Sequence, residues 1–256
     1  METEINRKME RISYNYFAED YHQKRKKPWK ALKDFLNRLN NEVYQLSGNC
    51  LDLGCANGRN FKLLYSKNRK LIGIDNSIHF LKIAQEQLND TNLYSNIEKN
   101  SIQLILSDML FLPIRPNTIN NIYSIAAIHH IKKLSEQKRL MNQIHEILKD
   151  QGFFLFSVWR KYQRNYIKYF IIDWIKRSIS KSYHNRQKEI GLENFGDIFI
   201  PWKVAKDNET YYRFYHLFSK LEIKKMLKQY RIKEVKKLGG PNKKDNFFVL
   251  AKKLES

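Results

Sequence analysis

The stretch CLDLGCANGRN, from Cys50 to Asn60, decides the fold of this chain. It is a short apolar run, a turn with Gly54 and Gly58, and then an amphipathic segment, which predicts a strand, a turn and a helix. In an open α/β sheet such a turn lies at the carboxyl edge of the strands, where ligands bind. No Gly-Lys-Ser/Thr follows it, and its spacing does not match G-x-G-x-x-G. A phosphate-binding loop and a dinucleotide turn are therefore not favoured.

Two carboxylates follow the next two predicted strands. Asp75 ends the second strand in LIGIDNS, about twenty residues beyond the loop, where it can accept both ribose hydroxyls of an adenosine. Asp108 ends the third strand in LILSDMLFLP, where it can take an adenine amino group, with Met109 and Leu110 against the ring. The alternative is that these acids only cap helices or hold loops. With Asp52 in the first strand, three successive strands each end in a carboxylate, which favours a cofactor site.

Short apolar runs alternate with amphipathic segments along much of the chain, which is the pattern of a parallel sheet covered by helices. The expected strands lie near residues 49–53, 70–75, 102–106, 121–126 and 153–159. The expected helices lie near 11–21, from Pro28 onward, and near 57–67, 77–89 and 135–149, with Ser77 as an N-cap and Asp150-Gln151-Gly152 as a stop.

The alternation is interrupted after Trp159. Residues 160–188 are basic, aromatic and irregular, so they are interpreted as an insertion. A helix is expected near 220–230, followed by the strands RIKEVKKL and DNFFVLAKKL, whose short connection GGPNKK favours an antiparallel pair. We expect a single domain over 1–256, with an N-terminal helical cover over 1–45 and a basic aromatic insertion over 160–200.

The formal net charge is +21, which makes nucleic acid the first partner to consider and an anionic membrane surface the second. A basic surface kept only for solubility is the remaining alternative. Cys50 and Cys55 are too few for a disulfide framework and are not spaced as a zinc knuckle, so we expect no metal and a reducing compartment. No segment approaches the roughly 20 apolar residues of a membrane span, so we expect a soluble, cytoplasmic protein without a membrane partner.

These motifs resemble those of the class I S-adenosylmethionine-dependent methyltransferases, whose pattern is D-x-G-x-G-x-G, an acid after the second strand, and S/A-D-x-x-x-L-P. The corresponding segments here are LDLGCANG, GIDNS and SDMLFLP. The resemblance implies an α/β, Rossmann-like fold: a seven-stranded, mostly parallel sheet with an antiparallel last strand and helices on both faces.

The same resemblance implies S-adenosylmethionine as the cofactor, with Asp52 and the Gly54 loop at its methionine end, Asp75 at the ribose and Asp108 at the adenine. The implied cofactor contacts are Asp52, Gly54, Cys55, Asn57, Gly58, Asp75, Asn76, Asp108, Met109 and Ile125. Two positions depart from the pattern. Ala56 replaces the usual middle glycine, which is acceptable if the backbone keeps φ negative there, and INN (119–121) replaces the usual Phe-Asp before the fourth strand.

The C-terminal third, together with one motif near the start of the chain, resembles a narrower family, the tRNA wobble-uridine carboxymethyl methyltransferases of eukaryotes and archaea. The motifs are RKKPW near the start and DIFIPW, YYRFYHLF and KKDNFFVLAKK late in the chain, against R-Y-K-P-W, V-P-W, Y-R-Y-Y-H-L-Y and R-D-N-W-W in the family. The resemblance implies esterification of the carboxylate of 5-carboxymethyluridine in the tRNA anticodon loop. It also implies a heterodimer with a small zinc-binding activator subunit that covers an apolar strip on the sheet.

A carboxylate is already ionised at pH 7, so its methylation needs cations and alignment and no general base. The candidate catalytic residues are Arg25, His129, His130, Arg213, Tyr215, His216 and Asn246. The His pair follows the fourth strand, and one of the two is expected to pack under the helix. Arg213 and His216 would face the same side if their segment is helical, and either could instead tie the insertion to the core.

The insertion is the best candidate for binding the tRNA backbone. Its lysine and arginine side chains can neutralise phosphates, and its aromatic rings can stack on unpaired nucleobases. A helix lying on a membrane would have a similar composition. Two other functions stay open: a small-molecule or quinone methyltransferase of the same fold, and a tRNA-binding scaffold without catalysis.

Overall fold

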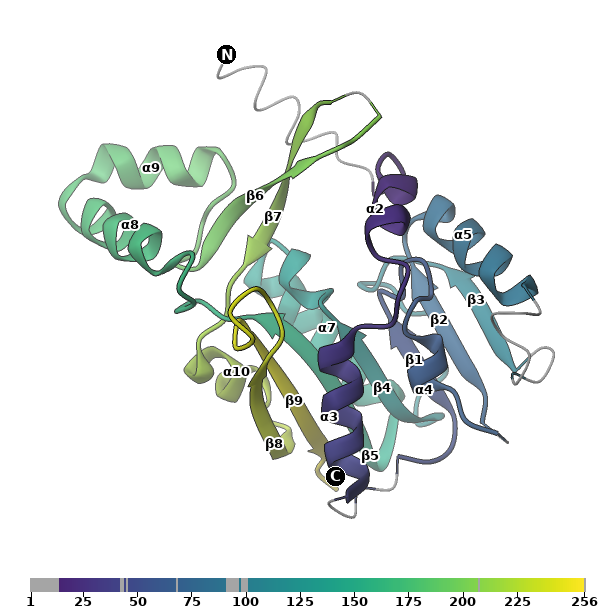
Figure 1. The fold of residues 1–256 in the computed structure, drawn as a ribbon. Coiled ribbons are helices and arrows are strands. Elements are labelled where there is room, and N and C mark those ends of the chain that lie inside the picture. The colour runs from purple at the N-terminus through teal and green to yellow at the C-terminus, as the bar shows by residue number, and fades with distance from the viewer. Residues whose placement is uncertain are drawn as a thin grey trace.

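The computed structural model describes residues 14–41, 44, 46–67, 69–90, 97, 101–206 and 208–255. Within them, the main sheet has seven strands in the order β3-β2-β1-β4-β5-β9-β8 (Figure 1). The strands are β1 (Cys50–Leu53), β2 (Leu71–Asp75), β3 (Ile102–Leu106), β4 (Ile119–Ile125), β5 (Leu148–Trp159), β8 (Tyr230–Leu238) and β9 (Asn246–Lys253). Strands β1 to β5 are parallel, and β9 pairs antiparallel with both β5 and β8. The predicted fold class is confirmed.

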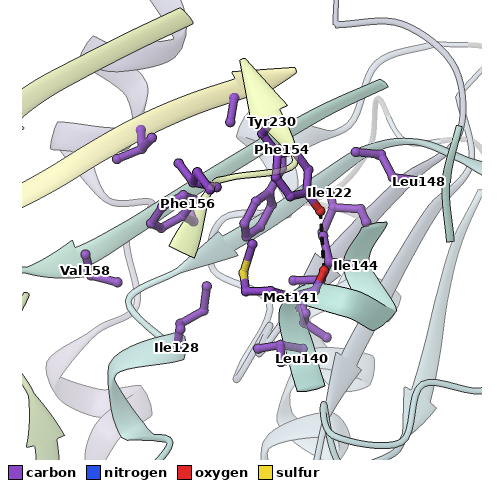
Figure 2. Close-up of a cluster of buried hydrophobic side chains, with 14 of the residues drawn as sticks. Ile122, Ile128, Leu140, Met141, Ile144, Leu148, Phe154, Phe156, Val158 and Tyr230 are labelled. Atoms are coloured by element: carbon purple, nitrogen blue, oxygen red, sulfur yellow. Dashed lines mark hydrogen bonds between the residues drawn. The ribbon is translucent and has the colours of Figure 1, made fainter. Parts of the chain in front are cut away.

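Helices cover both faces of this sheet. The helices α3 (Lys30–Asn41), α4 (Phe61–Leu64) and α5 (Ile78–Asn89) pack on one face, where Phe35, Phe61 and Leu81 join a buried cluster with Leu155 and Phe248. The opposite face is covered by α7 (Leu134–Ile147) and α10 (Lys220–Met226). Figure 2 shows that cluster, in which the Tyr230 hydroxyl donates to the Met141 carbonyl over 3.5 Å. These two buried clusters hold the helices against the sheet and so position the loops at the carboxyl ends of its parallel strands.

The chain reverses direction across the sheet between β1 and β4. The strands β1 to β5 all run in the same direction, but from β1 the order β1, β2, β3 leads toward one edge of the sheet, whereas β4 and β5 lie on the other side of β1. The loops after β1 and β4 therefore leave the sheet side by side. Ligands of open α/β sheets bind at such a switch point, beyond the carboxyl ends of the strands. The fold therefore places CLDLGCANG and the His pair at one site.

The insertion contains two helices, α8 (Ile167–Ile179) and α9 (Lys181–Glu189), and the first strand of a separate hairpin, β6 (Asp197–Lys203) with β7 (Thr210–His216). Figure 1 shows α8 and α9 lying away from the seven-stranded sheet. The inward side of α8 buries Asp173, which pairs with Arg177 over 2.8 Å. Its large exposed side chains are Ile167, Ile171, Ile172, Trp174, Ile175 and Ile179.

The segment YYRFYHLF was considered as a helix, and this is wrong for most of its length, because Tyr211 to His216 belong to β7. Successive side chains of a strand point to opposite faces. Arg213 therefore shares a face with Tyr215, and His216 points to the other side. The two side chains therefore do not face the same side, as they would in a helix.

Three predicted boundaries are corrected. The helix at 57–67 is reduced to α4, because Gly58 has a φ of +72°, which an α-helix does not allow. The helix at 135–149 ends at Ile147, and β5 begins at Leu148, which pairs with Ile119, so 150–152 do not form a helix stop. Residues 11–13 of the first expected helix lie outside the described residues, and the helix observed beyond them is α2 (Ala18–Lys24).

Candidate functional site

A cavity of about 900 Å³ lies at the carboxyl edge of the sheet. Its walls come from the loops after β1, β2, β3 and β4, from the N-terminal segment around α2, and from the hairpin of β6 and β7. Of the predicted site residues, those that line it are Arg25, Gly54, Asp75, Asn76, Asp108, Met109, Ile125, His129, His130, Arg213, Tyr215 and Asn246. The two resemblances in the sequence thus converge on one cavity.

The loop after β1 brings its backbone close to the loop after β4. Gly54 has a φ of +78°, and a Cβ at this position would lie 2.5 Å from the Cβ of Ala127. A side chain here would therefore collide with the cavity wall. Ala56 has a φ of +48°, so the expectation of a negative φ is wrong. The reason is a hydrogen bond, because this conformation lets the Ala56 N–H donate to Asp75 Oδ2 over 2.9 Å.

Asp75 is held between two backbone donors. Its Oδ1 accepts from the Ser77 N–H over 2.9 Å, and its Oδ2 accepts from Ala56. Burial raises the pKa of Asp75, and the backbone N–H groups of Ser77 and Ala56 oppose that shift. Ser77 is the N-cap of α5, as predicted, accepting from the Phe80 N–H. Asp75 therefore holds its loop as well as facing the cavity.

Asp108 lies at the end of β3, in the loop beside Met109. Its Oδ1 accepts from the Leu110 N–H over 2.8 Å, so it also holds a loop. The side chain is exposed at the cavity rim. Asp75 and Asp108 are thus rigid acceptors placed along one wall.

Four of the predicted cofactor contacts do not line the cavity, namely Asp52, Cys55, Asn57 and Gly58. Asp52 is 2% exposed in β1, and burial, followed by the charge of Asp75, raises its pKa to about 7. Asn57 is fully buried, and its Nδ2 lies 3.0 Å from His22 Nδ1 and donates to the Arg25 carbonyl. Asn57 therefore fastens the N-terminal segment over the loop.

Two arginines meet at an indole ring on the opposite wall. The guanidinium carbon of Arg213 lies 4.4 Å from the Trp202 ring centroid, and that of Arg25 lies 5.9 Å from it. Within the described chain, Arg213 forms no ion pair, and its buried Nε has no hydrogen-bond partner. Arg25 donates to the Lys24 carbonyl over 2.9 Å. This wall is cationic and open to an anion.

The His pair lies in a 3-10 helix, η1 (Ile128–His130), next to β7. His130 Nδ1 lies 2.9 Å from the Phe214 carbonyl, and His129 Nδ1 accepts from the Trp159 N–H at 3.4 Å. Burial lowers the pKa of His130 to about 3 and that of His129 well below its ordinary value. Burial also raises the pKa of Tyr215 to about 12. These three side chains are therefore neutral near pH 7, and the positive charge of this wall comes from arginine.

His216 lies outside the cavity lining. It is 1% exposed, and its Nδ1 lies 2.6 Å from Asp197 Oδ1 in β6. Its Nε2 lies 3.6 Å from Glu222, which also pairs with Lys161 over 2.8 Å. Burial lowers the pKa of His216, but the hydrogen bond to Asp197 and the nearby carboxylate of Glu222 outweigh it and leave that pKa raised. His216 thus ties the hairpin to α10, which is the alternative considered from the sequence.

Asn246 lines the cavity at the start of β9 and is 2% exposed. Its Nδ2 donates to the Leu238 carbonyl over 3.3 Å, and its Oδ1 has no partner among the described residues.

Several cavity residues were not predicted as site residues. Among them are the aromatic residues Tyr14, Phe17, Tyr21, Trp159, Tyr166 and Trp202. Trp202 is oriented by Asp20, whose carboxylate accepts from its Nε1 over 2.8 Å. The sequence did not assign these rings to the site, because composition alone does not separate a buried ring from one that lines a cavity. The spacing of Tyr14, Phe17 and Tyr21 along one helical face was the available signal.

Among the described residues, no group of three or more His, Cys, Asp or Glu side chains is arranged to hold a metal ion. The same residues include no helix with the length and apolar character needed to cross a membrane.

Known proteins with similar sequences and structures share this fold. Residues 51–156 match the model of a methyltransferase domain. The tRNA (carboxymethyluridine(34)-5-O)-methyltransferase of Schizosaccharomyces pombe is 26% identical over 99% of this chain and 100% of its own length. A crystal structure of an S-adenosylmethionine-dependent methyltransferase from Methanosarcina mazei superposes with a TM-score of 0.67 at 17% identity, covering 85% of this chain and 98% of that one.

A second similar solved structure contains a bound ligand. The 1,6-didemethyltoxoflavin-N1-methyltransferase of Burkholderia thailandensis was crystallised with S-adenosylhomocysteine, and it has a TM-score of 0.59 at 12% identity, over 99% of this chain and 90% of that one. With the domain match, these likenesses identify the fold as that of the class I methyltransferases, and the similar structure from M. mazei is described as S-adenosylmethionine-dependent.

The cavity of this chain fits that cofactor. Gly54 lets the backbone of its loop lie close to Ala127, where a Cβ would collide, and Asp75 has both oxygens fixed by N–H donors with lone pairs left for hydroxyl groups. Met109 and Ile125 supply apolar surface beside them. These residues would hold the nucleoside, which leaves the wall of Arg25 and Arg213 for a methyl acceptor.

Proposed function

We propose that this chain, an S-adenosylmethionine-dependent methyltransferase, methylates the carboxylate of 5-carboxymethyluridine at the wobble position of tRNA and forms the methyl ester. The relative in S. pombe bears that activity in its name and aligns over nearly the whole chain, at 26% identity. The motifs RKKPW, DIFIPW and YYRFYHLF, which carried the resemblance, supply Arg25, Trp202 and Arg213 of one cavity wall.

The observation that carries the proposal is the position of Arg213. A partly buried guanidinium without an acidic partner is costly, because the charge loses water and gains no counter-ion. The described part of the chain gives Arg213 no such partner, and Arg25 brings a second cation to the same indole ring. A substrate carboxylate would supply the missing charge, and a planar guanidinium can bind it through two parallel hydrogen bonds.

The neutral histidine and tyrosine side chains beside the two arginines agree with this chemistry. The bound cofactor supplies an electrophilic sulfonium methyl group, and the substrate carboxylate is ionised at pH 7, so no residue has to remove a proton. His130 and Tyr215 are neutral and can only orient the substrate by hydrogen bonds. Arg25 and Arg213 would hold the carboxylate in line, and the aromatic residues around them would exclude water.

The net charge of +21 suits a polyanionic substrate. In the α8–α9 segment, the exposed basic side chains are Lys168, Lys176, Lys181, Arg186 and Lys188, whereas Asp173 is buried against Arg177. We propose that these lysine and arginine side chains bind the phosphates of the tRNA backbone. Affinity for tRNA should then fall steeply with salt, and an affinity indifferent to salt would contradict this assignment.

A small zinc-binding activator subunit is part of the same proposal, and it rests on the family resemblance. The edge strand β3 and the loop after it expose Leu106 at 54% and Phe111 at 60%, which is the kind of apolar strip such a subunit would cover. Full activity and solubility of the purified single chain would count against this partner.

The proposed function is tested with tRNA that lacks the methyl ester. The full chain, co-expressed with the activator, is incubated with that tRNA and with methyl-labelled cofactor, and the nucleosides are then identified after digestion. We expect label in 5-carboxymethyluridine as an ester that mild alkali releases. Label that is absent from this nucleoside, or bound to a ring atom and stable to alkali, would defeat the assignment.

A further inference from the structure

His130 projects into the cavity from η1, next to the wall of Arg213. Its ring centroid lies 4.4 Å from that of Tyr215, 4.5 Å from that of His129 and 5.4 Å from that of Tyr14. The ring is partly exposed, whereas His129 is 1% exposed. Of the two histidines, His130 is therefore the one that a substrate can reach.

The tautomer of His130 is fixed by its backbone partner. The Phe214 carbonyl, 2.9 Å from Nδ1, can only accept a hydrogen bond, so Nδ1 carries the proton. Burial, and to a lesser extent the charge of Arg213, lowers the pKa of the ring to about 3. In the neutral ring with a protonated Nδ1, Nε2 is an acceptor.

No described residue donates to this acceptor. The His130 side chain has one hydrogen bond within the described chain, that of Nδ1, and its Nε2 is not among the buried polar atoms that are closed off without a partner. The cavity wall thus presents an open, uncharged acceptor near Tyr215. A ligand that fits it must offer a donor.

The proposed substrate has a donor at the matching place. In a uracil that bears a carboxymethyl group on C5, the next ring positions are the C4 carbonyl and then the N3–H. Arg213 and His130 both lie against Tyr215, at 5.2 and 4.4 Å, so a carboxylate at Arg213 would bring the N3 edge toward His130. Cytosine has an unprotonated N3 and would set a lone pair against a lone pair.

We propose that His130 is a specificity residue that accepts a hydrogen bond at Nε2 from the N3–H of a uracil base, and so selects uridine over cytidine. The inference rests on the proposed function, because it places the substrate carboxylate at Arg213. His129, which accepts from the Trp159 N–H and stacks on Tyr215 with ring centroids 4.7 Å apart, positions the pair without touching the base.

Two RNA substrates that differ only at the wobble base test this assignment. Anticodon stem-loops with 5-carboxymethyluridine or 5-carboxymethylcytidine are given to the full chain, co-expressed with the activator, and kcat/KM is measured for each. We expect the unmodified chain to prefer the uridine by about 100-fold, because binding cytidine would leave the acceptor without a donor. Equal rates on the two bases would overturn the inference and leave the proposed function standing.

The variant His130→Phe keeps an aromatic ring and removes the acceptor. It should lower kcat/KM on the uridine substrate and bring the ratio between the bases close to one, with unchanged affinity for S-adenosylmethionine as proof of folding. A His130→Phe protein that binds the cofactor and keeps the full preference would also overturn the inference. If the unmodified chain methylates neither base, the proposed function fails, and the role of His130 fails with it.

His129→Phe is the matched control. It sits one residue away in the same 3-10 helix and stacks on the same tyrosine. It should reduce stability or rate on both substrates alike and keep the ratio. If the preference for uridine over cytidine is lost in His129→Phe and kept in His130→Phe, the base contact belongs to His129 and the proposal is rejected.

Discussion

The guanidinium of Arg213 lies over the Trp202 ring, 4.4 Å from its centroid, and the Nε1 of Trp202 donates to Asp20. The hairpin of β6 and β7 supplies both the arginine and the ring, and the N-terminal α2 supplies the acid. Asp20 also accepts from the Ala205 N–H and pairs with Lys24, so the indole is held on its polar edge. An aromatic face held in this way orients a cation without neutralising it.

Replacing Arg213 should separate substrate binding from cofactor binding. Arg213→Ala removes a positioned donor to the substrate carboxylate, and kcat/KM should fall by about 100- to 1000-fold. Arg213→Lys keeps the charge but loses the planar fork, so its loss should be smaller. Affinity for S-adenosylmethionine, measured by calorimetry, should stay close to that of the unmodified chain. Arg164→Ala, at an exposed position of the insertion, is the control, and equal losses in both variants would contradict the role of Arg213.

Arg25 and its basic neighbours should behave differently. Arg25→Ala should abolish ester formation with little change in cofactor affinity, because Arg25 lines the cavity and lies near Trp202. Lys26→Ala, at an exposed neighbouring position, should only weaken tRNA binding. Lys24 is not an equivalent control, because its Nζ donates to Asp20 and to the Lys203 carbonyl and so joins α2 to the hairpin. A loss of esterification in Lys26→Ala as large as in Arg25→Ala would argue against a specific role for Arg25.

His216 should prove to be a stabilising residue rather than a catalytic one. His216→Ala leaves Asp197 buried without its partner, which should lower the free energy of unfolding by about 3 kcal/mol. In the folded protein that remains, kcat should be nearly unchanged, because His216 does not line the cavity. Denaturant unfolding and kcat measured on the same preparation check this. A stable variant without activity would return His216 to the catalytic set.

The stabilisation by His216 depends on pH through two opposite pKa shifts, those of His216 and Glu222. His216 has a raised pKa, so its stabilisation is complete below its ordinary value of 6.5 and is lost as the pH rises through the folded pKa. Burial raises the pKa of Glu222, but the nearby His216 and the hydrogen bonds from Lys161 and Ser219 outweigh it and lower that pKa to about 2. The stabilisation by Glu222 is therefore present above its ordinary value of 4.5 and is lost as the pH falls toward 2. The cost of His216→Ala should be largest between pH 4.5 and 6.5.

Asp52 should make both stability and cofactor binding depend on pH. Its pKa is raised to about 7, so the stability it allows is complete below its ordinary value of 3.8 and falls as the pH rises through 7. Asp52→Asn should therefore be more stable than the unmodified chain at pH 8, and the difference should vanish near pH 4. A positively charged ligand favours the ionised form, so affinity for S-adenosylmethionine should rise between pH 6 and 8 in the unmodified chain and stay flat in Asp52→Asn. Parallel curves for the two proteins would show that Asp52 is not the titrating group.

The sequence predicted the parts of the site that depend on strand ends. Gly54, Asp75 and Asp108 lie where the alternation of strands and helices placed them, because parallel strands bring their carboxyl ends to one edge. It did not predict β7, because YYRFYHLF has too short a pattern to separate a helix from a strand. Arg213 and His216 lie on the same side of a helix but on opposite sides of a strand, so their orientation depends on which of the two forms. The Trp202–Asp20 contact joins segments about 180 residues apart in sequence, and no local pattern encodes such a contact.

Ala56 offers the sharpest test of the loop geometry. Its φ of +48° lies in the left-handed region, which costs a residue with a Cβ about 1 kcal/mol more than glycine. Glycine also loses more backbone entropy on folding, which offsets part of that gain. Ala56→Gly should therefore leave the free energy of unfolding unchanged or raise it by up to about 1 kcal/mol. The N–H that donates to Asp75 is kept, so affinity for S-adenosylmethionine should not fall.

Two further variants separate the left-handed backbone from a general effect of glycine. Ala31→Gly, in the helix α3, should lower stability by about 1 kcal/mol, because there the alanine is in its preferred conformation. Ala56→Val should be destabilised, and it should bind the cofactor more weakly, because a branched side chain resists a positive φ and would shift the N–H away from Asp75. Denaturant unfolding and calorimetry on the three proteins measure both effects. If Ala56→Gly loses as much stability as Ala31→Gly, residue 56 keeps a negative φ, and the hydrogen bond between its N–H and Asp75 does not form as described.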